Sequence, residues 1–122
     1  MTEQKSTAKL DFEVLRRAGE QRDPDAMLEL YADDAELRIV DRNTPPSSPR
    51  VLRGKEEIAE YLRDIFGRDM THTIENEVVG EDRVAFNVAC EYTDGTRVLA
   101  AQNLEVRDGK IVREVEVVAW DE

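Results

Sequence analysis

Cysteine and histidine are almost absent from this chain of 122 residues. Its one cysteine, Cys90, has no second thiol in the chain to pair with, which excludes an internal disulfide. With His72 as the one histidine, a structural zinc site built from clustered Cys and His ligands is also excluded. A cation bound by carboxylates stays open, but no motif supports one. We therefore expect neither a metal nor a cofactor.

Basic residues and long apolar runs are also scarce. The chain has 17 Lys and Arg against 28 Asp and Glu, a net charge of −11, and a field of that sign repels nucleic acids and anionic membrane surfaces. No apolar run is long enough to span a bilayer, and residues 1–7 lack the apolar region of a signal peptide. We expect a cytoplasmic protein without a nucleic-acid or membrane partner. Its length suits one domain, 8–122, after a frayed segment 1–7.

Four β-favouring segments with short turn signals between them occupy the second half of the chain. Asp94-Gly95 and Asp108-Gly109 separate alternating apolar residues, and Asp-Gly in that setting is a strong hairpin signal. The pattern predicts an antiparallel meander. Its strands are expected at 71–79, 83–92, 97–106 and 110–120.

The first half reads as mainly helical. Apolar residues recur at three- and four-residue spacing over 8–21, which predicts an amphipathic helix. Asp23 and Pro24 can begin a second helix that ends near 33–34, before a strand at 35–40. Three prolines in 43–49 predict a loop. The clearest apolar stripe predicts a third helix from Gly54 to Gly67.

Two strands of the meander carry polar residues in unusual positions. On the third strand, Gln102 is the one amide on a face shared with Ala100 and Leu104. The last strand is ambiguous, since its apolar residues occur on both faces. One face has Ile111, Val115 and Val117, and the other has Val112, Val118 and Trp120. The direction of Glu114 and Glu116 therefore stays open.

Three short motifs and the element order carry a family resemblance. The motifs are Leu30-Tyr31-Ala32-Asp33-Asp34-Ala35, Arg53-Gly54-Lys55-Glu56-Glu57-Ile58 and Asp108-Gly109-Lys110-Ile111-Val112. In combination, over residues 8–120, they resemble the nuclear-transport-factor-2-like superfamily, and most closely its SnoaL-like branch. The resemblance implies an α+β cone in which a curved, mixed or antiparallel sheet wraps around three N-terminal helices and encloses an apolar pocket. It also implies a homodimer formed through the outer sheet face.

The superfamily includes ketosteroid isomerases, limonene epoxide hydrolases and polyketide cyclases, so the fold alone does not define a reaction. The isomerases' aspartate base, oxyanion-binding tyrosine and protonated aspartate correspond by this resemblance to Ile39, Leu15 and Gln102. Ordinary ketosteroid isomerase chemistry is therefore not expected. Of the epoxide hydrolase positions, which correspond to Ala100, Gln102 and Glu116, the last alone keeps a carboxylate. The SnoaL-like cyclases also use an acidic residue on the last strand.

Three residues are the catalytic candidates. Glu116 would become an acid or base near neutral pH if it faced a pocket, and is otherwise a solvated strand glutamate. His72 has an ordinary pKa near neutrality but could equally be a hydrogen-bonded core residue. Gln102 could orient a carbonyl or a water, or be a satisfied buried amide. The residues expected to line the pocket and bind substrate are Tyr31, Ile39, Asp41, Val88 and Trp120.

These residues predict an enzyme that binds a small hydrophobic molecule and works by cofactor-free proton transfer, as an isomerase, cyclase or hydrolase. The alternative is a non-catalytic ligand-binding module or a dimeric interaction module. The apolar residue at position 39 favours that alternative.

Overall fold

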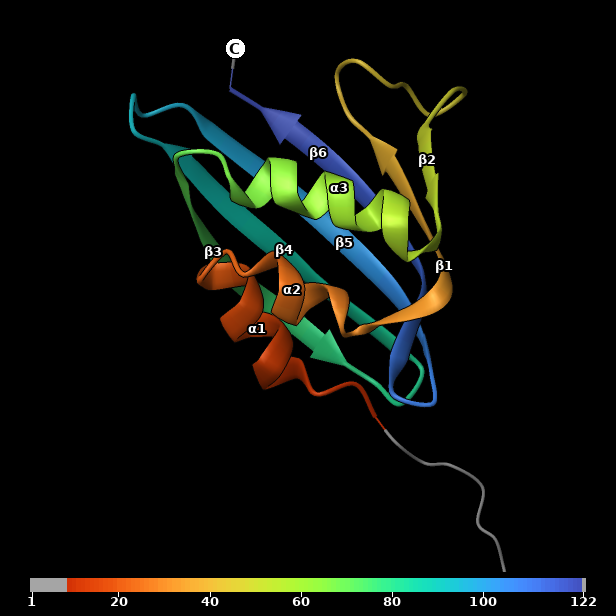
Figure 1. Cartoon of the computed structure of the whole chain (residues 1–122). Coiled ribbons are helices and arrows are strands. Elements are labelled where there is room, and N and C mark those ends of the chain that lie inside the picture. The colour runs from red at the N-terminus through yellow and green to blue at the C-terminus, as the bar shows by residue number, and fades with distance from the viewer. Residues whose placement is uncertain (1–8, 122) are drawn as a thin grey trace, which may run out of the picture.

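The computed structural model describes residues 9–121, and the predicted frayed segment 1–7 lies outside them. Three helices and six strands follow one another along the chain (Figure 1). The helices are α1 (Phe12–Glu20), α2 (Pro24–Leu28) and α3 (Gly54–Phe66). The strands are β1 (Tyr31–Val40), β2 (Arg50–Arg53), β3 (Met70–Val79), β4 (Arg83–Tyr92), β5 (Arg97–Arg107) and β6 (Lys110–Trp120).

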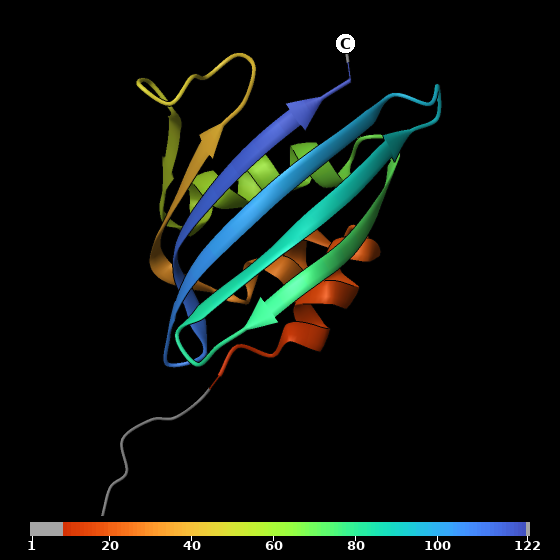
Figure 2. The same cartoon turned by 180° about the vertical axis from the view of Figure 1, so that it is seen from behind.

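The six strands form one curved sheet in the order β2-β1-β6-β5-β4-β3. All neighbouring strands are antiparallel except β1 and β6, which are parallel. Figure 2 shows the outer face of the sheet, with the three helices gathered behind it. The α+β class, the mixed sheet and the meander from β3 to β6 are therefore confirmed.

Local sequence signals account for the turns and helix starts. Gly95 and Gly109, in the two Asp-Gly turns, have φ of +92° and +77°, a backbone conformation that glycine adopts without a steric penalty. The side chain of Asp11 accepts a hydrogen bond from the N–H of Val14 (3.2 Å) at the start of α1. Asp23 does the same for Ala26 (3.1 Å) at the start of α2.

Three of the predicted element boundaries are wrong in the N-terminal half: the start of the first helix, the end of the second helix and the start of the first strand. Helix α1 begins at Phe12 rather than at residue 8, and α2 ends at Leu28 rather than near 33–34. The second difference has a tertiary cause, because the N–H of Ile111 donates to the carbonyl of Leu30 (2.8 Å) and Tyr31 pairs with Ile111. Pairing with β6 thus extends the first strand back to Tyr31. The sequence reasoning also missed β2, which pairs with β1.

The core lies between the helices and the concave face of the sheet. Helix α3 packs on β1, and α1 packs on β3. The largest side chains that are fully buried there are Leu15, Leu37, Ile39, Ile58, Leu104 and Ile111. Because the helices do not fill the whole concavity, part of this layer is a cavity.

Candidate functional site

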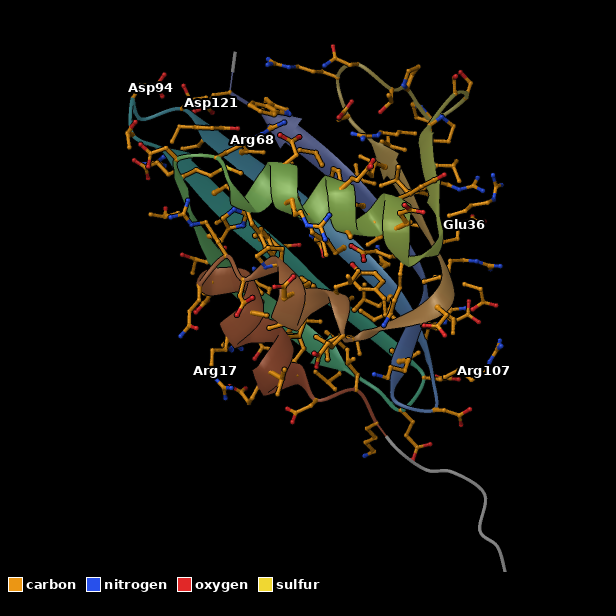
Figure 3. All side chains as sticks on the ribbon, viewed as in Figure 1. Arg17, Glu36, Arg68, Asp94, Arg107 and Asp121 are labelled. Carbon is orange, nitrogen blue, oxygen red and sulfur yellow. The ribbon has the colours of Figure 1, made fainter. Side chains whose placement is uncertain are left out.

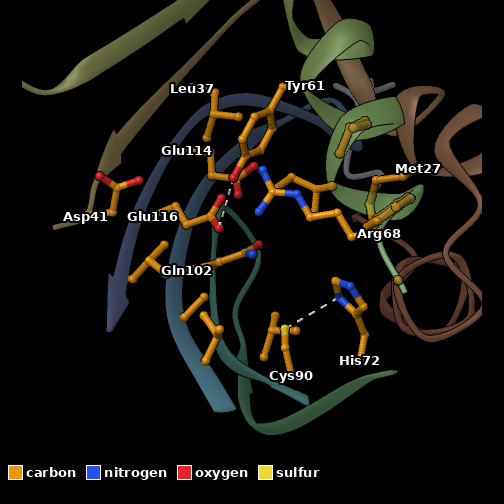
Figure 4. Close-up of a pocket in the computed structure, with 18 of the residues that line it drawn as sticks. Met27, Leu37, Asp41, Tyr61, Arg68, His72, Cys90, Gln102, Glu114 and Glu116 are labelled. Atoms are coloured by element: carbon orange, nitrogen blue, oxygen red, sulfur yellow. Dashed lines mark hydrogen bonds between the residues drawn. The ribbon is translucent and has the colours of Figure 1, made fainter. Parts of the chain in front are cut away.

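A cavity of about 450 Å³ lies between the helices and the concave face of the sheet (Figure 4). Its inner part is lined by buried residues such as Leu15, Tyr31 and Leu104. Its outer part is lined by more exposed residues, including Arg42 and Arg50. This change in exposure defines an inner end and an opening to solvent.

Strand β6 points both of its glutamates into this cavity. Glu114 and Glu116 are 2% and 8% exposed and line the cavity, whereas Val117, on the opposite face, is 47% exposed. Ile111 is also buried because the β5–β6 register slips between Glu105 and Val106, which leaves Val112 as an extra residue. The apolar residues on both faces of β6 thus follow from a bulge near its start.

Each glutamate accepts a hydrogen bond from a tyrosine. The hydroxyl of Tyr31, on β1, donates to Oε1 of Glu114. The hydroxyl of Tyr61, on α3, donates to Oε2 of Glu116 over a longer distance, 3.4 Å. The looser bond and slightly greater exposure leave Glu116 better placed than Glu114 to contact a bound molecule.

The two carboxyl groups are shifted toward their protonated forms. Burial raises the pKa of both above the ordinary value, and the negative charge of Glu114 raises the pKa of Glu116 further. Burial, followed by the charges of the two glutamates, also raises the pKa of Tyr31 and Tyr61, so both phenols remain hydrogen-bond donors. A pair of this kind takes up and releases a proton nearer to neutral pH than isolated carboxylates do.

Gln102 lies directly across from Glu116. The two residues are paired on the antiparallel strands β5 and β6, and both line the cavity. Side chains at such opposed positions start only about 5 Å apart. The structure therefore brings together two of the three predicted catalytic residues, as Figure 4 shows.

His72 also lines the cavity, but away from this pair (Figure 4). Its Nδ1 lies 3.7 Å from Sγ of Cys90, and its ring is edge-on to Phe66 with centroids 5.5 Å apart. Among residues 9–121, no group bonds its buried Nε2. Burial, then the charge of Arg22, lowers the pKa of His72 to about 4, so the ring is neutral at pH 7.

Four of the five predicted wall residues line the cavity: Tyr31, Asp41, Val88 and Trp120. The prediction for Ile39 is wrong. That side chain is buried in the core but is not among the residues that line the cavity, and Leu37 is the cavity-lining residue of this strand segment. Asp41 belongs to the opening. Although partial burial raises its pKa, hydrogen bonds from the hydroxyl and N–H of Thr44 lower it overall.

Sequence reasoning treated Glu114 only as a neighbour of Glu116 and missed Tyr61. The signal for Glu114 was its period-two spacing to Glu116, Val118 and Trp120, all of which line the cavity. Tyr61 could be assigned only to the buried stripe of α3. Within the described range, 9–121, no cluster of three or more His, Cys, Asp or Glu could hold a metal. In the same residues, no helix is long and apolar enough to cross a membrane.

This fold, a curved mixed sheet over three helices, is shared with a known family. A family model described as a SnoaL-like domain matches residues 13–114, and the chain belongs to that family. No curated protein matches the chain.

Solved structures share the fold at low sequence identity. An NTF2-like protein of unknown function from Burkholderia xenovorans has a TM-score of 0.76 at 18% identity, covering 91% of this chain and 81% of its own. A proposed ketosteroid isomerase from Kribbella flavida has 0.71 at 20%, covering 91% and 75%. A proposed polyketide cyclase from Sinorhizobium meliloti has 0.66 at 18%, covering 86% and 91%.

Proposed function

We propose that this protein is a small-molecule enzyme in which Glu116 transfers a proton within the cavity. The observation that carries this proposal is the buried pair of Glu114 and Glu116, each bonded to a tyrosine and both facing the cavity. Charged groups are costly to bury unless they are paired, so two adjacent buried carboxyls need a reason. Acid–base work near neutral pH is such a reason, because it requires carboxyl groups with a raised pKa.

The reaction class that fits is proton abstraction next to a carbonyl group in a hydrophobic molecule. The Glu116 carboxylate takes the proton from carbon, the C–H electron pair forms a carbon–carbon double bond, and the carbonyl π electrons move to oxygen. The amide N–H of Gln102, opposite Glu116, donates to that oxygen. In a substrate with a C=C bond conjugated to the enolate, return of the proton from Glu116 to the distal carbon gives an isomer. Attack of the enolate carbon on a second carbonyl of the same molecule gives a ring, and the alkoxide so formed takes the proton back from Glu116. Neither route needs a cofactor.

Glu114 acts through Glu116 in this scheme. Its negative charge raises the pKa of Glu116, while the Tyr31 hydroxyl holds it in place. Glu114 is therefore a positioning residue that adjusts the pH at which Glu116 is a base. His72 contributes shape and a polar contact rather than charge, because its ring is neutral.

Deuterium exchange provides the test. The protein is incubated in D₂O with a panel of cyclic ketones and β-keto esters, beginning with 2-tetralone, and loss of the α-proton signal is followed by NMR. We expect E116Q to slow the exchange about a hundredfold or more. The control is E91Q, an exposed glutamate on β4, which should leave the rate unchanged. Equal rates for E116Q and the unaltered protein would refute the assignment.

E114Q separates the two roles. Without the charge of Glu114, the pKa of Glu116 should fall, and the rising limb of the pH–rate profile should move to lower pH. A merely structural role for Glu114 would lower the rate at every pH without moving the profile.

The second candidate function is non-catalytic binding of a hydrophobic ligand. Two observations favour it: the residue at the isomerase base position is the buried Ile39, and the cavity histidine is uncharged. The same panel distinguishes the candidates. A binder would be stabilised by a ketone in a thermal-shift measurement yet would not exchange its α-protons.

A further inference from the structure

Three arginines line the opening of the cavity, together with two aromatic residues. We call this set the rim: Arg42, Arg50, Arg68, Tyr92 and Trp120. The rim residues come from four separate parts of the chain: the β1–β2 segment, the residues after α3, and the ends of β4 and β6. In Figure 1 the β1–β2 loop and the end of β6 lie at the same end of the molecule.

Contacts with aromatic rings hold the rim arginines in place. The guanidinium of Arg42 lies 4.4 Å from the ring centroid of Trp120, and Trp120 stacks on Tyr92 with centroids 5.9 Å apart. Arg68 donates to the Tyr92 hydroxyl (3.2 Å). On the α3 side, Arg50 lies 5.2 Å from the ring centroid of Tyr61. These contacts reduce the side-chain freedom that an arginine loses on binding an anion.

Nearby carboxylates offset the rim's positive charge only in part. Asp64 pairs with Arg68 (3.0 Å), and Asp41 lies near Arg50 but is bonded to Thr44. Asp121 bonds the backbone N–H of Arg97. None of the salt bridges among the described residues includes Arg42 or Arg50.

The positive charge of the rim contrasts with the negative net charge of the molecule. Other charged side chains, such as Arg17, Glu36 and Arg107, project outward at the edges of the structure (Figure 3). With a net charge of −11, the protein as a whole repels anions. A group of arginines at the opening of this cavity is therefore unexpected for a protein that binds only uncharged molecules.

The inner part of the cavity favours uncharged, apolar groups, whereas the rim favours anions. Its walls are largely apolar, and its polar groups include Glu114 and Glu116. The negative charge of a bound anion would be unfavourable beside these two residues. A molecule with an anionic end would therefore enter with its apolar part first and leave the charge at the rim.

From these observations we propose that the cavity binds an amphiphilic carboxylate, with its apolar body inside and its carboxylate held at the rim by Arg42 and Arg50, assisted by Arg68. This inference rests on the proposed function, since it assumes that the cavity binds a small molecule. It adds the substrate class and its direction: the group that reacts at Glu116 lies at the uncharged end.

Three probes of the same chain length test the charge preference: decanoate, 1-decanol and decylammonium. Trp120 is the only tryptophan, so its fluorescence reports events at the rim, and calorimetry gives an independent dissociation constant. We expect decanoate to bind about tenfold more tightly than decanol, and decylammonium most weakly. Added salt should weaken decanoate binding and leave decanol binding unchanged.

Substitution of two rim arginines tests whether the preference for the carboxylate arises at the rim. R42Q/R50Q should weaken decanoate binding about tenfold and leave decanol binding unaltered, because two partly exposed ion pairs contribute about that much. The matched control is R63Q, an exposed arginine on α3 outside the cavity lining, which should change neither. Equal binding of decanoate and decanol, or no effect of R42Q/R50Q, overturns this inference and leaves the proposed function intact. Binding of none of the three probes also overturns this inference, and the exchange test with 2-tetralone then decides separately whether the proposed function holds.

Discussion

Replacing Glu116 by glutamine should make the stability of the protein less dependent on pH. Burial, then the charge of Glu114, raises the pKa of Glu116 from 4.5 to about 8 in the folded protein. Between these values the folded state binds a proton that the unfolded state has released, so stability falls as the pH rises through this window and levels off above about pH 8. A glutamine cannot ionise and contributes no such fall.

The size of the effect follows from the same numbers. The difference between about 8 and 4.5, at about 1.4 kcal/mol for each pKa unit, corresponds to about 5 kcal/mol. Because the cavity opens to solvent at the rim, part of this penalty is relieved, and we expect a gain for E116Q over the unaltered protein of about 2–5 kcal/mol near pH 9. Near pH 4.5 and below, where the acid is protonated and resembles an amide, the two proteins should have similar stability.

Urea unfolding followed by the fluorescence of Trp120 measures this, at several values from about pH 5 to about pH 9. E91Q is the control, because its side chain is exposed and should leave the slope of stability against pH unchanged. Parallel curves for E116Q and the unaltered protein would refute the reasoning. They would mean that Glu116 is solvated, and the acid–base proposal would lose its basis.

Three further outcomes are expected. Y31F removes the donor to the buried Glu114 and should cost about 1–3 kcal/mol at neutral pH in the same urea assay, while an unchanged stability would show that this bond contributes little. H72L should leave stability unchanged or higher, because the buried Nε2 has no partner among the described residues, and a large loss would contradict this. We also propose a homodimer through the outer sheet face, where Leu99 and Val117 are each 47% exposed, and L99E should then yield a monomer by light scattering.

Local signals were sufficient for most of the fold. The Asp-Gly turns and the alternation between them predict the meander, and the apolar stripe predicts α3 with nearly its observed limits. The end of α2 was not predictable in this way, because pairing of Tyr31 with Ile111, eighty residues away in the chain, decides it. Tertiary pairing there overrides a local helical preference.

The site was predictable only in part for a related reason. The positions of Gln102 and Glu116 on neighbouring strands follow from the hairpin, but the face of β6 depends on one extra residue, Val112. A one-residue slip moves every following side chain to the other face. If the alternation is counted forward from the buried Ile111, it predicts that Glu116 faces outward. If it is counted back from Trp120, it predicts that Glu116 faces the cavity, as it does in the structure.

The same register explains how the site can be acidic without an acid at position 39. Strands β1 and β6 are parallel neighbours, and Ile39 is paired with Glu116. Adjacent strands are about 4.8 Å apart. The carboxyl group of Glu116 therefore lies at the same level of the sheet as position 39, one strand further along. There it faces the cavity, while Ile39 is buried in the core outside the cavity lining. The apolar residue at position 39 therefore argues against one arrangement of the base rather than against a base in this cavity.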